Sequence, residues 1–227
     1  MMPSLAFSQK SLDVFVNMPD TLCLYLDKNA RQAMVTEAIS NNDEGINNKL
    51  NGVSSILWFT NDCALIRLSQ SSTLQLRLLP TTDSTSIVCL INTVSAPAAE
   101  SVVKFYDSEW NLLKDKIALP ENDKILSYFT HRPDSITEER YAELLTYIDP
   151  IMVSAEFSRE EPVIHFDLSL PMLNADDRKQ VNEIILQRNF KWDGKIFNEY
   201  QIFELFYIVL LQIERKSTTF VTCFSWY

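Results

Sequence analysis

The sequence predicts an α+β protein in which an antiparallel meander of about seven to nine strands is covered by three or four helices. Residues 53–113 contain short apolar runs separated by turn residues, and in one run Leu74, Leu76 and Leu78 alternate with polar neighbours, which is the period of a strand. In the flanking segments, apolar residues recur at spacings of three and four, as on amphipathic helices. Because 227 residues suffice for one sizeable core, a single domain is expected.

The meander is expected to hold five or six strands, at residues 54–60, 63–70, 73–79, 85–94, 102–106 and 110–113. The run 85–94 is apolar on both faces, which favours a central position. Leu76 is predicted to be buried against a helix, and Gln75 on the opposite face is predicted to lie in solvent. The segment Asp107-Ser108-Glu109 is expected to close the last hairpin.

Helices are expected on both sides of the meander. Residues 22–38 carry an amphipathic face, and Asp27 either caps a second helix there or lies in one bent helix. Residues 41–52 resemble a surface loop and residues 118–133 an irregular connection. After the meander we expect a helix begun by the capping box 135–138, strands at 151–157 and 163–170, a helix begun by Asn174 and Asp177, and a hairpin at 190–197 around Asp193-Gly194.

Composition excludes several classes of function. The formal net charge of −10 disfavours nucleic acid as a partner, because phosphate binding needs a basic patch. With three glycines in the whole chain, a phosphate-binding loop is not expected. The cysteines lack metal-site spacing, so we expect no metal and no cofactor. Cys63 and Cys89 are expected on strands of one sheet, where a disulfide between them is one alternative. The other alternative, two buried free thiols, is the more common state of such cysteines.

The two ends of the sequence differ from the rest. Residues 1–8 end in small residues at positions 6 and 8, a pattern typical of a signal-peptide cleavage site, and we interpret them as the remnant of a truncated signal peptide. Residues 198–227 form an apolar tail that is predicted to lie outside the domain, with an extra packed helix as the alternative. The apolar run 202–213 is too short to span a bilayer, so no transmembrane segment is expected. The expected location is periplasmic or extracellular.

Aromatic residues are the best candidates for a binding surface. Trp58, Tyr106, Trp110 and Trp192, with Asp107 beside them, are able to stack on sugar rings, although such aromatics more often belong to a core. His165, Asp167 and Ser169 share one face of a predicted strand, but their order does not suit a catalytic triad, and a polar face opposite a buried one explains them better. We therefore predict no catalytic residue.

A set of segments in one continuous order resembles a known family. They are Val16-Asn17-Met18-Pro19-Asp20, Leu26-Asp27-Lys28-Asn29-Ala30-Arg31, Leu78-Leu79-Pro80, Asp83-Ser84, Thr93-Val94-Ser95-Ala96-Pro97, Lys104-Phe105-Tyr106-Asp107 and Lys191-Trp192-Asp193-Gly194-Lys195. The pattern is similar to the DUF3256 family of uncharacterised secreted proteins from Bacteroidales. The resemblance implies a domain over residues 11–197 and a secreted product, and it implies no activity.

Two functional hypotheses follow. The first is a non-enzymatic secreted or periplasmic domain that binds a protein or a glycan at the cell envelope. The second is a hydrolase whose site is assembled from carboxylates on turns, such as Asp83 and Asp107. The absence of a nucleophile motif from the sequence favours the first hypothesis.

Overall fold

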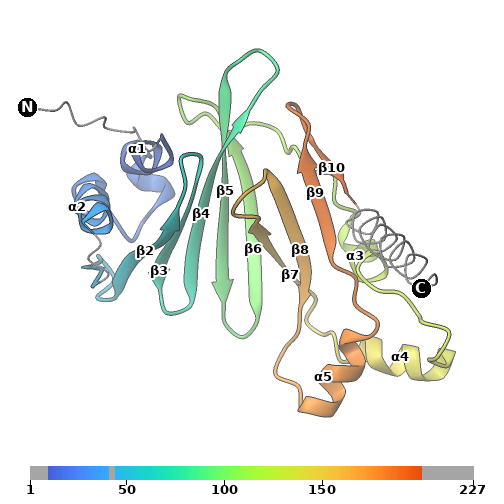
Figure 1. The fold of residues 1–227 in the computed structure, drawn as a ribbon. Coiled ribbons are helices and arrows are strands. Elements are labelled where there is room, and N and C mark those ends of the chain that lie inside the picture. Colours follow the sequence, from blue (N-terminus) through green and yellow to red (C-terminus); the bar gives the residue numbers. More distant parts are fainter. Residues whose placement is uncertain (1–9, 41–43, 201–227) are drawn as a thin grey trace, which may run out of the picture.

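The computed structural model describes residues 10–40 and 44–200, which form two antiparallel sheets flanked by helices (Figure 1). The first sheet is a meander of six strands in sequence order: β1 (Ile46–Asn47), β2 (Val53–Phe59), β3 (Cys63–Ser69), β4 (Ser72–Pro80), β5 (Ser86–Ser95) and β6 (Ala99–Tyr106). The second sheet has the order β10-β9-β8-β7 and consists of β7 (Met152–Phe157), β8 (Val163–Ser169), β9 (Arg188–Trp192) and β10 (Phe197–Glu199). The α+β class is confirmed, and the strands are divided between two sheets.

Two helices cover one face of the first sheet, α1 (Lys10–Asn17) and α2 (Lys28–Ile39), joined through the short 3-10 helix Asp20–Leu22 (Figure 1). Phe15 of α1 and Met34 of α2 pack in one core cluster with Leu74 and Leu76 of β4. Leu76 is fully buried there, as predicted. Asp27 caps α2 by accepting a hydrogen bond from the backbone N–H of Ala30, so a new helix begins there, after the 3-10 helix that ends at Leu22, and the region is not one bent helix.

The opposite face of the first sheet is also covered, and the prediction that Gln75 lies in solvent is wrong. Gln75 is only 5% exposed because β7 packs over it, and its Oε1 accepts a hydrogen bond of 2.8 Å from the backbone N–H of Phe157 in β7. The backbone N–H of Ala155, also in β7, donates to Ser101 Oγ of β6 at 2.9 Å. β7 is an edge strand of its sheet, so side chains of the first sheet satisfy N–H groups along that edge. Polar alternation on this face therefore marks contact with the backbone of another strand and not contact with water.

The remaining helices pack with the second sheet. These are α3 (Asn122–Tyr128), α4 (Glu138–Thr146) and α5 (Ala175–Asn182), and α4 and α5 lie together at one end of the second sheet in Figure 1. Leu144 of α4 and Val181 of α5 are fully buried in a second core cluster with Phe166 and Phe190. This cluster holds the sheet and the three helices together.

Several local predictions are modified by the structure. α1 occupies residues that the sequence reading left without an element, and α3 lies in the segment predicted to be irregular. Thr137 is the N-cap of α4, so Ser135, the predicted cap, lies two residues before the observed one. The predicted strand at 110–113 is reduced to one isolated bridge between Tyr106 and Leu112. The hairpin around Asp193-Gly194 is confirmed, with Phe197 paired to Trp192 and Gly194 at φ +102°.

Cys63 and Cys89 are buried free thiols. Both residues pair with Arg77 of β4, from opposite sides, so a whole strand separates them. Neighbouring strands lie about 4.8 Å apart, which puts the two Cα atoms beyond the roughly 7 Å that a disulfide tolerates. Burial raises the pKa of the Cys63 thiol to about 11.

The predicted signal remnant at residues 1–8, and residues 201–227 of the predicted tail, lie outside the described residues. β10 continues to Glu199, past the predicted domain end at 197. In the part of the chain that the structure describes, no helix combines the length and the apolar composition that crossing a bilayer requires.

Candidate functional site

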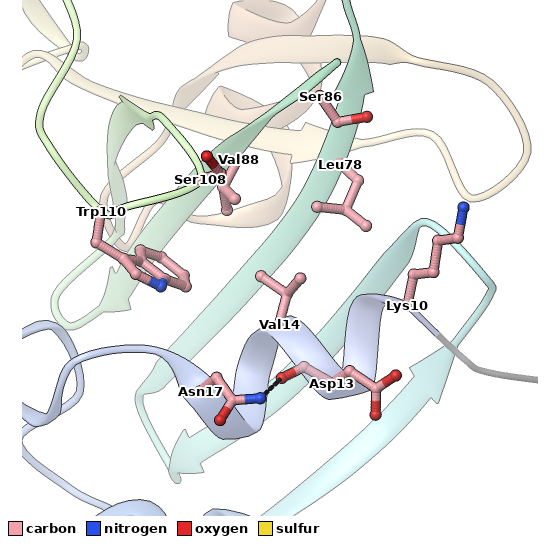
Figure 2. Close-up of a pocket in the computed structure, with 9 residues that line it drawn as sticks. All are labelled: Lys10, Asp13, Val14, Asn17, Leu78, Ser86, Val88, Ser108 and Trp110. Carbon is pink, nitrogen blue, oxygen red and sulfur yellow. Dashed lines mark hydrogen bonds between the residues drawn. The ribbon is translucent and has the colours of Figure 1, made fainter. Parts of the chain in front are cut away.

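A cleft of about 440 Å³ lies between α1 and the first sheet (Figure 2). Its apolar floor is formed by Val14 of α1 and by Leu78 and Val88, which are directly paired across β4 and β5. Trp110 from the loop after β6 closes one side, and its ring is directed into the space between α1 and the strands (Figure 2). The volume lies within the range of small-ligand sites.

Polar groups surround this apolar floor. Lys10, Asp13 and Asn17 come from α1, and Ser86 and Ser108 come from the sheet side. The three polar residues of α1 follow the three- and four-residue spacing of one helix face, which they share with Val14. The other face of α1 buries Leu12 and Phe15 in the core, so the polar face is directed to the cleft.

Asn17 is held in place by two hydrogen bonds. Its Nδ2 donates to the backbone oxygen of Asp13 at 2.9 Å (Figure 2), and its Oδ1 accepts from Lys28 Nζ at 2.9 Å. The amide therefore lies fixed at the rim of the cleft before any ligand arrives, which lowers the entropic cost of binding.

A tight turn presents the Trp110 ring to the cleft. Asp107 Oδ1 accepts hydrogen bonds of 2.9 Å from the backbone N–H groups of Glu109 and Asn111, and Trp110 N donates to the Asp107 carbonyl at 3.1 Å. Trp110 adopts φ +66°, a left-handed conformation that is strained for a bulky residue and persists only where the surroundings enforce it. Its ring also packs on Tyr106, with centroids 5.8 Å apart.

The turn accounts for the titration of Asp107. The hydrogen bond from the Asn111 side chain, followed by the backbone hydrogen bonds from Asn111 and Glu109, lowers the pKa of the Asp107 carboxyl below its ordinary value. The carboxylate is thus occupied in shaping the loop, and its role at the site is to position Trp110.

The five candidate residues from the sequence fall into three places. Tyr106, Asp107 and Trp110 are brought together, and of these only Trp110 lines the cleft. Trp192 is 7% exposed, and its indole N–H donates to the backbone oxygen of Pro80 at 2.6 Å, which is the environment of a core residue. Trp58 packs against the second core cluster, with the Arg159 guanidinium 5.3 Å from its ring centroid. The candidates therefore do not form one continuous surface.

Sequence reasoning missed the α1 side of the cleft, namely Lys10, Asp13 and Asn17. The signal was present, because Leu12, Phe15 and Val16 recur at helical spacing between these polar residues. Ser86 and Ser108 carried no signal, since a serine near a turn is ordinary.

His165 and Asp167 share one face of β8, and both are half-buried. His165 Nδ1 lies 2.5 Å from Asn189 Oδ1, and Asp167 accepts a hydrogen bond of 3.0 Å from Gln187. Ile164, Phe166 and Leu168 on the other face are buried, as predicted. Within residues 10–40 and 44–200, no three His, Cys, Asp or Glu side chains gather in a way that suits a metal ion.

Comparisons with known proteins agree with this fold. Residues 4–197 match the family described as "Protein of unknown function (DUF3256)". A solved structure, a domain of an uncharacterized protein from Porphyromonas gingivalis W83, superposes with a TM-score of 0.64 at 19% sequence identity and covers 83% of this chain and 98% of that chain. At that identity the likeness concerns the fold alone. No curated protein matches the chain significantly.

Proposed function

The chain belongs to the DUF3256 family, whose description assigns no activity, and on that premise we propose that it is a non-enzymatic binding domain of the cell envelope, secreted or periplasmic, that takes a glycan in the cleft beside α1. The observation that carries the proposal is the presentation of Trp110. A bulky residue is held at positive φ by a hydrogen-bonded turn, and its ring is directed over an apolar floor with polar groups at the rim. An aromatic ring with flanking hydrogen-bonding groups suits the apolar face and the hydroxyls of a sugar.

The size of the cleft favours a glycan over a protein as the ligand. Stable protein interfaces bury on the order of 1,200 Å² or more and present broad apolar centres. This cleft is a hollow of about 440 Å³ whose rim carries Lys10, Asp13 and Asn17. Such a rim offers both donors and acceptors to a short stretch of sugar hydroxyls.

A binding role is supported over the hydrolase because the turn carboxylates are engaged locally. Asp83 accepts hydrogen bonds from Thr81 and Thr85 in its own turn, which lower the pKa of its carboxyl to about 2. Asp107 is engaged in the same way by its own turn. A general acid needs a raised pKa, whereas both of these are lowered.

The test is binding of the purified protein to an array of bacterial envelope polysaccharides and peptidoglycan fragments, repeated with Trp110→Leu and Trp58→Leu. Both variants lose one partly buried tryptophan, but only Trp110 lines the cleft. We expect Trp110→Leu to lose at least about fivefold in affinity, because one stacked ring contributes about 1–3 kcal/mol. Trp58→Leu should bind as the wild type does.

Three results contradict the proposal. Equal losses in the two variants would place binding elsewhere. An array on which no glycan binds would refute the assignment of a glycan as the ligand. Release of reducing ends from a bound glycan would refute the non-enzymatic assignment. Export is tested separately, by finding the protein in the periplasm or the medium after expression in its own host; recovery from the cytoplasm alone would contradict it.

A further inference from the structure

A second cavity, of about 300 Å³, lies where β7 meets the first sheet. One wall is formed by Thr73 and Gln75 of β4, together with Thr93 of β5. The other wall is the polar face of β7 and β8, on which Glu156 is paired with His165 and Ser154 with Asp167. We call this the corner groove, and it is separate from the cleft beside α1.

The corner groove holds two carboxylates and a single basic side chain. Glu156 and Asp167 both line it, and neither makes an ion pair within the described residues. None of the described lysines or arginines lines the groove, and its one basic side chain is His165, which is paired with Glu156 across β7 and β8. Elsewhere carboxylates do have basic partners, for instance Glu161 with Lys191 at 3.0 Å. A hollow in which carboxylates outnumber basic side chains concentrates ligands of positive charge.

Gln75 provides an independent indication of a ligand. Its Oε1 must face Phe157, because a backbone N–H only donates, and this fixes the orientation of the amide. The Nε2 group then points away with two hydrogens and finds no acceptor among the residues that the structure describes. A donor on a side chain that is 5% exposed is costly to leave unpaired, so water or a bound molecule in the groove accepts from it.

We propose that the corner groove binds a small ligand that carries a protonated primary amine beside neutral oxygen groups, the chemistry of a free amino sugar. The amine pairs with the Glu156 and Asp167 carboxylates, and a hydroxyl or ring oxygen accepts from Gln75 Nε2. A purely neutral sugar leaves the carboxylates without a counter-charge, and an anionic ligand is repelled by them. The volume, at the lower limit for ligand sites, suits a ligand of this size.

The experiment is a titration of the isotope-labelled protein with D-glucosamine, with the Gln75 side-chain amide resonance as readout. Glucose and N-acetylglucosamine serve as matched ligands, since the first lacks the amine and the second carries it in acylated, uncharged form. We expect a saturable shift of the Gln75 amide with glucosamine and none with the other two. Glu156→Gln should weaken binding about three- to fivefold, the range for a partly exposed ion pair.

Glu160→Gln is the control, because it removes the same charge from the exposed β7–β8 turn outside the groove. It should leave the affinity for glucosamine unchanged. Equal weakening by Glu156→Gln and Glu160→Gln would show that only net charge matters and would overturn the proposal. Binding of N-acetylglucosamine as tight as that of glucosamine would exclude the amine as the recognised group. A Gln75 amide that stays unshifted at saturating glucosamine would show that water alone fills the groove.

Discussion

Replacing Arg77 by methionine tests how the two sheets are joined. The guanidinium is completely buried and donates to the backbone oxygens of Ser158 and Glu161, which follow β7. It also donates twice to Asp62 Oδ2, at 3.1 and 3.2 Å. Methionine keeps most of the aliphatic stem and removes all four hydrogen bonds. The substitution therefore isolates the polar connection from the packing of the stem.

The magnitude follows from the separate contributions. Two hydrogen bonds from a charged donor to backbone oxygens contribute about 1.5–3 kcal/mol each. The pair with Asp62 adds at most about 1 kcal/mol, because that carboxylate is 44% exposed. Removing a buried charge returns several kcal/mol of desolvation free energy, which offsets part of the loss. We expect Arg77→Met to lower the free energy of unfolding by about 2–4 kcal/mol.

Urea denaturation followed by circular dichroism measures this change, with Asp62→Asn as the comparison. Asp62→Asn should lose no more than about 1 kcal/mol, because it leaves the two backbone oxygens of the β7–β8 segment bonded to Arg77. Limited proteolysis of Arg77→Met should also show faster cleavage at the β7–β8 turn. An Arg77→Met protein as stable as the wild type, or an Asp62→Asn protein that loses as much, would refute the idea that Arg77 joins the sheets.

Three further outcomes are expected. Leu76→Ala should lower the free energy of unfolding by about 2–5 kcal/mol, because Leu76 is fully buried. Gln75→Ala should lower it by about 1–3 kcal/mol, because the backbone N–H of Phe157 loses its acceptor. A loss below about 0.5 kcal/mol for Gln75→Ala in urea denaturation would mean that the side chain is solvated. Cys63 and Cys89 should resist alkylation by iodoacetamide at pH 8 until urea unfolds the protein, because burial raises the pKa of both thiols; rapid labelling of the native protein would contradict their burial. Hydrogen bonds within its turn lower the pKa of Asp107 in the folded protein, so the turn should be more stable above about pH 4 and should lose this stability as the pH falls through the folded pKa. The indole resonance of Trp110 should report this change with pH, and Asp107→Asn should abolish the change.

The sequence was sufficient to predict the meander because its signals are local. The alternation around Leu76 and the turn at Asp193-Gly194 each specify an element within a few residues. The solvated face predicted for Gln75 was wrong for a different reason. A polar residue on a strand has the same pattern whether water or the backbone of a distant strand satisfies it, and the partner of Gln75 lies in β7, 82 residues away.

The candidate site shows the same limit. The aromatic residues were identifiable, and the sequence placed Tyr106 beside Trp110 in one hairpin. The α1 side of the cleft depended on the helix at residues 10–17, which spans only about two turns and so carries a weak periodic signal. Whether a tryptophan lines a cleft or fills a core depends on tertiary packing, as the contrast between Trp110 and Trp192 shows.

The most direct test of the binding cleft is to follow the indole N–H resonances of Trp110 and Trp192 while an envelope glycan selected on the array is added. The indole of Trp192 is an internal reference, because it is buried and hydrogen-bonded to the backbone of Pro80. We expect a saturable shift of the Trp110 resonance at glycan concentrations that leave Trp192 unchanged. A Trp110 resonance that stays in place while the glycan binds would contradict the assignment of this cleft as the binding site.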